Sequence, residues 1–400
     1  MHAVKLLHKR LLNTRTIKHA YRLGALMKAV ESVLNGGKLT LTHLGRNMQG
    51  ASYEKHKIKC IDRLLGNTNL HSERSAVYYQ MGRWLLSQVN RPLIVVDWSD
   101  VYEGQQFVML TAAIPLGGRA LTLYEKVYPM KQYNSPKAHK QFLHELSHVV
   151  PKNKRPIIIT DAGFRGPWFR EINALGWDWL GRIRKGVYYS LNQGGKWNKT
   201  SQLYQKATRT MKYIGSGLLS KKNPYKCQLY LVKKNTKGSN RPLKRYGDKS
   251  MDILCRKLYR DPWLLATSLP HNRGAAKRIE KIYTLRMQIE ESFRDMKNGR
   301  WGLGLEYARS HHSQRLDNLL VIGTLGIFVL WLNGVIAKTK GWTKHYQANT
   351  EKRYNVLSIF FLGRRLINDK KLKFSKDDFT AAFQKLSELT QNQVNFVGIC

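Results

Sequence analysis

The stretch RPLIVVDWSD, residues 91–100, marks the point at which the pattern of residues changes from helical to strand-like. Residues 1–90 lack strand alternation and have the pattern of short helices with polar breaks. After residue 100, QFVMLTAAIPL (106–116) and RALTLYEKVYP (119–129) are two further runs rich in strand-forming residues, separated by glycine or polar turns. Three such runs in succession predict a three-stranded antiparallel meander.

Helical and apolar segments alternate after this meander. KAHKQFLHELSHVV (137–150) has apolar residues at helical spacing, and RPIIITDAGF (155–164) contains a short apolar run typical of a buried central strand. A helix near 167–175 and the strand WDWLGRIR (177–184) follow. The order βββαβαβ predicts the α/β class, with a mixed-sheet core of the ribonuclease-H-like kind.

Shifts in composition divide the chain into five expected domains. Short helices at the N-terminus suit helix-turn-helix docking on DNA, but on sequence alone they favour the alternative of a plain helical subdomain. Between Lys221 and Arg260 there are thirteen Lys or Arg and two acids, which favours a surface that follows a phosphate backbone over a merely solvated loop. The expected domains are a helical domain suited to DNA binding (1–90), the first part of the core (91–185), a basic β-rich insertion (186–262), the second part of the core (263–340) and a helical C-terminal region (341–400).

The charge of the chain points to a polyanionic partner. It carries 69 Lys and Arg against 26 Asp and Glu, a formal net charge of +43. Such an excess repels itself unless a polyanion binds, with nucleic acid the first choice and an anionic membrane surface the second. The four cysteines form no close pair, which indicates neither a zinc site nor a disulfide framework and fits a reducing cytosol.

The stretch NLLVIGTLGIFVLWLNGVIA, residues 318–337, is uncharged and long enough to span a membrane. Glycines and an asparagine dilute its apolar character, and basic residues flank both ends, so that no orientation signal is present. We therefore expect a buried core helix rather than a membrane span. The N-terminus lacks the apolar run of a secretory signal.

Acidic residues are scarce, so their positions are informative. Asp97 ends the run LIVV and Asp161 ends the run IIIT, each at the expected C-terminal end of a buried strand, where sites in open α/β sheets lie. Asp100 is a rival for Asp97, and a strand-end aspartate is often only a turn or cap residue. If both strand ends met a glutamate in one cleft, two hard divalent cations would relieve the repulsion and could support phosphoryl transfer.

The candidate glutamate, Glu290, lies in YTLRMQIEESFRDMK, residues 283–297. On an α-helix one narrow stripe of this segment carries four polar residues, Tyr283, Arg286, Glu290 and Lys297. The neighbouring face is apolar and carries Ile282, Ile289, Phe293 and Met296. An ordinary surface helix with spaced ion pairs is the alternative interpretation.

The Y-x2-R-x3-E-x6-K spacing of this segment resembles the signature of the cut-and-paste DDE transposases of the bacterial insertion sequence four family. Within that family, several further segments are similar to those of the insertion sequence ten group, which is found in the tetracycline-resistance transposon. They are KIKCIDRLLGN, VDWSD, TLYEK, DAGF, DPWLLATSLP, GLGL and GWTKHYQANT. The resemblance covers nearly the whole chain. It implies that Asp97, Asp161 and Glu290 form a catalytic triad that binds two Mg²⁺ ions, with Mn²⁺ able to substitute.

The resemblance also implies a reaction and its partners. Members nick the element's end, use the free 3′-OH to form a DNA hairpin, reopen it with water and join the 3′ ends to target DNA. Tyr283, Arg286 and Lys297 would hold phosphates, and Trp263 in DPWLLATSLP matches the base-stacking tryptophan, unless it is a core residue at a strand start. The implied partners are transposon-end DNA, target DNA and a second copy in a homodimer, with no membrane, in the bacterial cytoplasm near the nucleoid.

Three rivals stay open. His312, Arg315 and Tyr346 imitate part of a tyrosine recombinase site, although such enzymes need a largely helical catalytic domain and no metal. A catalytically inactive DNA-binding relic or repressor would share most of these features. A membrane-bound protein is the third.

Overall fold

The structure is a computed structural model that describes residues 2–102, 104, 106–191, 195–234, 261–348, 350, 353, 356–369 and 371–399. The chain forms two compact units: unit 1 comprises Met1–Pro156 and Met287–Cys400, and unit 2 comprises Ile157–Arg286. The five expected domains stay a prediction. Much of the basic stretch between Lys221 and Arg260 lies outside the described residues.

The predicted meander is present in unit 1. Strands β1 (Leu93–Asp100), β2 (Phe107–Leu116) and β3 (Arg119–Pro129) pair antiparallel in the order β3-β2-β1. Gly117 and Gly118 join β2 to β3 with φ values of +58° and +88°, a conformation that residues with a Cβ rarely adopt and that suits a tight hairpin turn.

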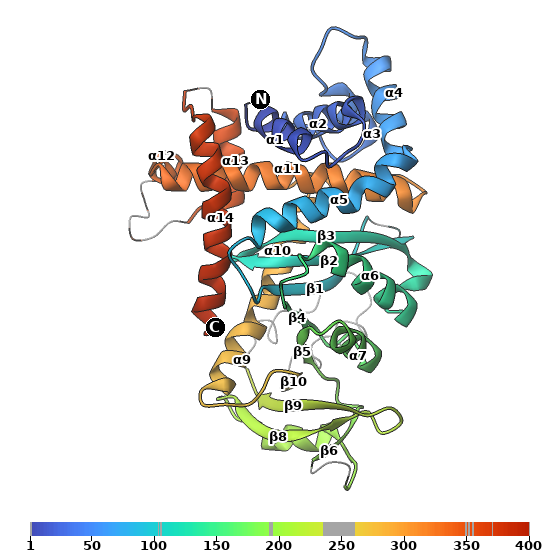
Figure 1. The fold of residues 1–400 in the computed structure, drawn as a ribbon, viewed down its shortest axis with the longest axis vertical. Coiled ribbons are helices and arrows are strands. Elements are labelled where there is room, and N and C mark those ends of the chain that lie inside the picture. The colour runs from blue at the N-terminus through green and yellow to red at the C-terminus, as the bar shows by residue number, and fades with distance from the viewer. Residues whose placement is uncertain are drawn as a thin grey trace, which may run out of the picture. The chain divides into compact units, whose positions relative to one another are not determined.

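Helix α11 (Ser313–Thr339) forms the centre of unit 1 and lies between the N-terminal helices and the meander (Figure 1). It has the length and composition of a membrane span, yet its most apolar window is entirely buried inside the unit. The prediction of a buried core helix is confirmed. The other helices of unit 1 are α1 (His2–Asn13), α2 (Ala20–Leu34), α3 (Leu41–Arg46), α4 (Glu54–Leu65), α5 (Thr68–Leu85), α6 (Pro136–Val149), α10 (Gln288–Lys297), α12 (Thr343–Tyr346), α13 (Ile359–Asn368) and α14 (Lys376–Val397), with short 3₁₀ turns at Met130–Gln132 and Leu305–Tyr307.

The glycines of α11 have a packing role. A Cβ on Gly334 would collide with the backbone carbonyl of Ile359, and a Cβ on Gly363 of α13 would collide with that of Leu330. The two helices therefore touch backbone to backbone, which only glycine permits at these positions. The glycines that make this segment less apolar are therefore required for the close packing of the two helices.

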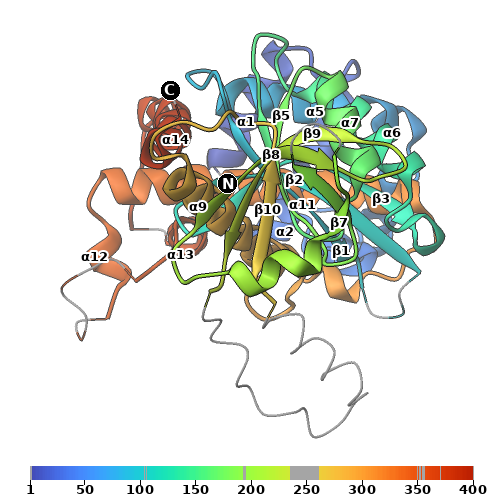
Figure 2. The ribbon, with the colours of Figure 1, turned by 90° about the horizontal axis from the view of Figure 1, so that it is seen from below.

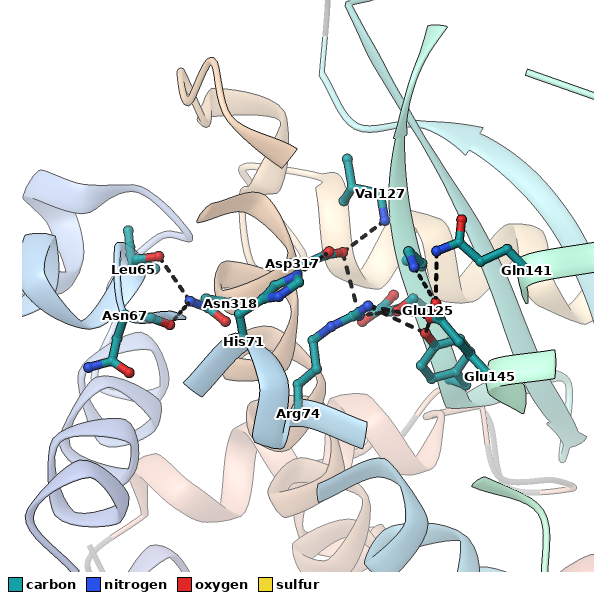
Figure 3. Close-up of polar contacts among 12 residues, drawn as sticks. Leu65, Asn67, His71, Arg74, Glu125, Val127, Gln141, Glu145, Asp317 and Asn318 are labelled. Atoms are coloured by element: carbon teal, nitrogen blue, oxygen red, sulfur yellow. Dashed lines mark hydrogen bonds and ion pairs between the residues drawn. The ribbon is translucent and has the colours of Figure 1, made fainter. Parts of the chain in front are cut away.

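A buried polar network ties α5, β3, α6 and α11 together (Figure 3). The Arg74 guanidinium of α5 is 5% exposed and lies 3.6 Å from both Asp317 Oδ1 and Glu145 Oε2. It also donates to the backbone carbonyl of Glu125 at 3.2 Å. Asp317 accepts further hydrogen bonds from the Val127 N–H at 2.8 Å, and its Oδ2 lies 3.1 Å from His71 Nε2.

The Glu125 side chain, next to this network, is bound by hydroxyl groups rather than by the guanidinium. It is 2% exposed and accepts hydrogen bonds from the hydroxyls of Thr324 and Tyr78. Burial raises the pKa of Glu125 to about 7, and these hydrogen bonds only partly oppose that shift. Near neutral pH this carboxyl is therefore partly protonated inside the core.

Unit 2 holds a mixed sheet in the order β4-β5-β10-β9-β8-β6-β7. β4 and β5 are parallel, and the other described pairs are antiparallel. Figure 2 shows β10, β9 and β8 side by side, with α9 beside them. The elements are β4 (Ile157–Thr160), α7 (Gly166–Ala174), β5 (Asp178–Arg182), β6 (Tyr188–Leu191), β7 (Asn198–Lys199), a 3₁₀ segment (Thr200–Lys206), β8 (Lys212–Leu219), β9 (Tyr225–Val232), β10 (Trp263–Thr267) and α9 (Ala275–Thr284).

The chain thus has a mixed α/β architecture, as predicted. The order β1, β2, β3, α6, β4, α7, β5 is the βββαβαβ order expected from the sequence. It is consistent with a ribonuclease-H-like core.

Candidate active site

Asp97 lies inside β1 rather than at its end. The sequence placed the end of the strand at Asp97, but the strand continues to Asp100, and only its burial changes at Asp97, from buried to half-buried. Pairing with β2 extends the strand, since Asp100 still lies opposite Val108. The Trp98 N–H donates to Asp97 Oδ1 at 2.8 Å.

The residue opposite Asp97 is Thr111 of β2. Paired residues of antiparallel strands project from the same face of the sheet, so the two side chains are neighbours. Thr111 is 2% exposed, and its hydroxyl has no hydrogen-bond partner within the described part of the chain. Such a buried polar atom is unusual, and here it lies beside a candidate catalytic carboxylate.

Glu290 and Lys297 lie on α10, which packs against the meander. The apolar face predicted for this helix is confirmed, since Ile289, Phe293 and Met296 are buried. Arg119 at the start of β3 pairs with Asp295 at 2.6 Å, and the Ala120 N–H donates to Ser292 Oγ at 2.9 Å. These contacts fix α10 on the strands.

Lys297 links α10 to β1. Its Nζ donates to Ser99 Oγ at 2.9 Å and lies 3.4 Å from the backbone carbonyl of Asp100. Burial lowers the pKa of Lys297, while nearby Asp100 and Glu306 oppose the shift. Because side chains two apart in a strand share a face, Asp97 and Ser99 project from the same side of β1. Asp97 therefore faces the side of the meander on which Lys297 lies.

The segment 283–297 is not the single helix that the sequence predicted. α9 ends at Thr284, Leu285–Met287 form a 3₁₀ turn, and α10 begins at Gln288. A 3₁₀ turn has three residues per turn instead of 3.6, so the angles assumed for one continuous stripe do not hold across it. Tyr283 and Arg286 belong to unit 2, whereas Glu290 and Lys297 belong to unit 1.

Tyr283 is only 4% exposed, and Trp263 packs edge-on against its ring at a centroid distance of 5.1 Å. Trp263 is the first residue of β10 and is half-buried, so it lies at a strand start, as the alternative interpretation had it, but is not fully enclosed in the core. The strand start and the ring contact with Tyr283 account for this burial.

Asp161 directly follows β4 in unit 2, as predicted. Its side chain is half-buried, and its Oδ1 accepts the Gly163 N–H at 2.7 Å, a short turn that orients the carboxylate. Arg184 Nε donates to the next carbonyl, that of Ala162, at 2.6 Å. This loop is therefore held from two sides.

The oxygen atoms of the candidate site, the carboxylates of Asp97, Asp161 and Glu290, are ligands of the kind that a hard divalent cation prefers. Within the described ranges, however, no three His, Cys, Asp or Glu side chains are grouped so that they could hold a metal ion. Asp97 and Glu290 belong to unit 1 and Asp161 to unit 2, and the convergence of the three carboxylates stays a prediction.

The residues of the rival recombinase pattern have other partners. Arg315 Nη2 pairs with Asp62 at 2.6 Å, and the Tyr346 hydroxyl donates to Asp369 at 3.1 Å. These two of the three residues are accounted for by interactions with a neighbouring helix or loop.

Two basic cavities were not identified from the sequence. One, of about 630 Å³ in unit 1, is lined in part by Lys38, His43, Arg309 and Arg315. The other, of about 1070 Å³ in unit 2, begins at Ala162, the residue after Asp161. Local spacing gives no signal for either, because each cavity is assembled from segments far apart in the chain.

A comparison with known protein families connects these features. Residues 90–326, more than half of the chain, match the model of the transposase DDE domain. A comparison with curated proteins gives no match. The matched range contains β1, β4 and α10, and hence all three predicted acidic residues. The chain belongs to the transposase DDE domain family, whose members act on DNA and generally use divalent metal ions.

Proposed function

We propose that the chain is a cut-and-paste DNA transposase of the insertion sequence four family, closest to the insertion sequence ten group. It binds transposon ends, cleaves them by metal-dependent hydrolysis through a hairpin intermediate, and joins the 3′ ends to target DNA. One observation carries the proposal: the DDE domain match spans residues 90–326 and includes Asp97, Asp161 and Glu290 in that order.

In this proposal Asp97, Asp161 and Glu290 are catalytic and would hold two Mg²⁺ ions, with Mn²⁺ able to substitute. When bound, such ions activate water and stabilise a leaving 3′ oxygen. The packing of α10 on the meander supports the assignment within unit 1, because Lys297 reaches the face of β1 from which Asp97 projects.

Lys297, Arg286 and Tyr283 would contact DNA phosphates near the reacting centre. Lys297 is already positioned by Ser99, so its ammonium loses little freedom when it binds a phosphate. Trp263 would stack on a base taken out of the helix during hairpin formation, for which its half-buried ring leaves one part accessible.

The overall charge of +43 supports DNA as the partner. The cavity of unit 1 adds to this support, since six of its lining residues are Lys, Arg or His and none of its described lining residues is acidic. We further propose that a homodimer brings two ends together with target DNA, in the bacterial cytoplasm and in association with the nucleoid.

The test is cleavage of a DNA that carries the ends of the element, by the purified protein with Mg²⁺. We expect Asp97→Ala, Asp161→Ala and Glu290→Ala each to lower cleavage by at least about a thousandfold while the affinity for end DNA is retained. Hairpin products would be detected by their mobility in denaturing gels.

Asp100→Ala is the matched control, because Asp100 lies on the same strand as Asp97 but ends it in an exposed position. It should cleave as the wild type does. Cleavage that persists in all three triad variants would reject the assignment. Binding of ends without cleavage by the wild-type protein, with either Mg²⁺ or Mn²⁺, would favour the inactive relic or repressor.

A further inference from the structure

We propose that the cavity of unit 2 beside Asp161 binds one strand of DNA, with Tyr188 as a stacking surface and Arg165, Lys221 and Lys222 as phosphate contacts. The inference rests on the proposed function, because it takes DNA as the substrate. It assigns a strand-binding role to residues outside the triad and outside the segment 283–297.

The cavity measures about 1070 Å³, and three segments line it. They are the loop from Ala162 into the start of α7, the connection between β5 and β6, and the turn between β8 and β9. The first of these segments begins next to Asp161, whose carboxylate is fixed by the Gly163 N–H. A strand that occupies the cavity would therefore contact the residue that directly follows a candidate catalytic aspartate.

The charge of the lining has one sign. Arg165, Arg184, Lys221 and Lys222 all line the cavity and are all exposed, and no described lining residue is acidic. Arg184 also holds the loop after Asp161 through the carbonyl of Ala162. Like charges gathered without a counter-charge cost free energy in the unbound protein, and a polyanion offsets that cost.

Aromatic surface lies beside these cations. Tyr188 begins β6 and is 39% exposed, whereas Tyr225, which also lines the cavity, is buried at 7% exposure. An accessible ring next to basic side chains is the arrangement with which proteins bind single strands, stacking bases and pairing phosphates. In a duplex the bases are stacked on one another, so an exposed ring favours an unpaired strand.

The backbone that joins the ring to the cations is constrained. Ser220, immediately before Lys221, has a φ of +70°, which is costly for a residue with a Cβ. Its N–H donates to the Tyr188 carbonyl at 2.9 Å. This bond holds the start of the β8–β9 turn against β6, so that Lys221 and Lys222 remain near Tyr188.

Direct binding of a fluorescein-labelled single strand of fifteen thymidines to the full chain tests the proposal, with anisotropy measured over a range of salt concentrations. We expect Tyr188→Ala to weaken binding about tenfold and Tyr188→Phe to bind as the wild type, since the ring is what stacks. The double variant Lys221→Ala with Lys222→Ala should lower the slope of log affinity against log salt by about 1.4, that is about 0.7 for each lost contact.

Lys206→Ala with Lys212→Ala is the matched control, because both lysines are exposed in unit 2 and neither lines the cavity. This control variant should change the slope of log affinity against log salt less than the double variant Lys221→Ala with Lys222→Ala does. Photocrosslinking of a strand that contains 5-iodouracil, followed by mass spectrometry, should find adducts at Tyr188. Circular dichroism and the thermal midpoint of each variant establish that it is folded.

Wild-type affinity in Tyr188→Ala, or equal slopes in the cavity pair and the control pair, would overturn the inference. A variant that loses affinity only for a duplex of the same length, or a mononucleotide that competes as well as the strand, would also overturn it. These binding results do not depend on cleavage. Failure of the wild type to cleave end DNA would reject the proposed function alone.

Discussion

Two groups of charged residues in this protein are built in opposite ways. Around Arg74 in unit 1, charges of both signs are buried together with their hydrogen-bond partners. In the cavity beside Asp161 in unit 2, cations are exposed and no described acidic residue lies among them. The first arrangement satisfies its charges inside the chain, and the second leaves them for a partner.

This difference separates structural from functional electrostatics. A buried ion pair adds little net stability when formed, but removal of one member leaves an uncompensated charge in a medium of low dielectric constant. Exposed like charges contribute little to folding and much to the binding of a polyanion. Substitutions in the two groups should therefore affect different measurements.

The largest expected effect on stability comes from Arg74→Ala. It would leave Asp317 without its guanidinium partner and should lower the free energy of unfolding by about 3 to 5 kcal/mol. Urea unfolding at pH 7 measures it. Arg46→Ala is the control, since Arg46 pairs with Glu54 on the surface, with side-chain exposures of 56% and 59%. A loss in Arg74→Ala no greater than in this control would contradict the role assigned to the network.

A smaller effect is expected from Glu125→Gln, and it depends on pH. The pKa of Glu125 rises from 4.5 to about 7 on folding, so ionisation in the unfolded state destabilises the wild type as pH increases through this window. Glu125→Gln has no carboxyl at this position, so its free energy of unfolding does not fall with pH for this reason. Its stability relative to the wild type should therefore grow by about 3 kcal/mol between pH 4.5 and 7.

Urea unfolding at pH 4.5, 6 and 7 measures this difference. Burial also raises the pKa of Asp295 to about 7, so the stability of Asp295→Asn relative to the wild type should also grow as pH rises. This growth comes on top of a loss of stability from the broken ion pair with Arg119. A constant difference between Glu125→Gln and the wild type across these pH values would show that the carboxyl is ionised in the core.

The smallest effect on stability is expected in the cavity. Replacement of Lys221 and Lys222 by Ala should shift the midpoint of thermal unfolding by less than about 2 °C, because both side chains are exposed and no buried group depends on them. Calorimetry measures the shift. A large drop in the midpoint would mean that these lysines hold the β8–β9 turn instead of serving a ligand.

Much of the fold followed from local patterns. The strand runs after residue 91, the apolar face of α10 and the position of Asp161 after β4 depend on periodicity and on residue type. Such signals survive in the folded state because each element packs the face that its sequence makes apolar.

What sequence reasoning missed depends on tertiary structure. A helical wheel assumes 3.6 residues per turn and therefore could not detect the 3₁₀ turn at Leu285–Met287. The extension of β1 beyond Asp97 depends on its pairing with β2. The Arg74 network and the cavity beside Asp161 combine segments far apart in the chain, for which spacing along the sequence carries no signal.

The backbone contact between α11 and α13 also determines how a shortened gene product would behave. A premature stop near residue 358 would remove α13 and α14, both of which pack on α11. The most apolar stretch of the uncovered helix has a mean hydropathy of 2.3, typical of a sequence that enters lipid bilayers. Such a truncated product should aggregate or partition into membranes even though it keeps Asp97, Asp161 and Glu290, so residues 359–400 are as necessary as the region that contains the acids.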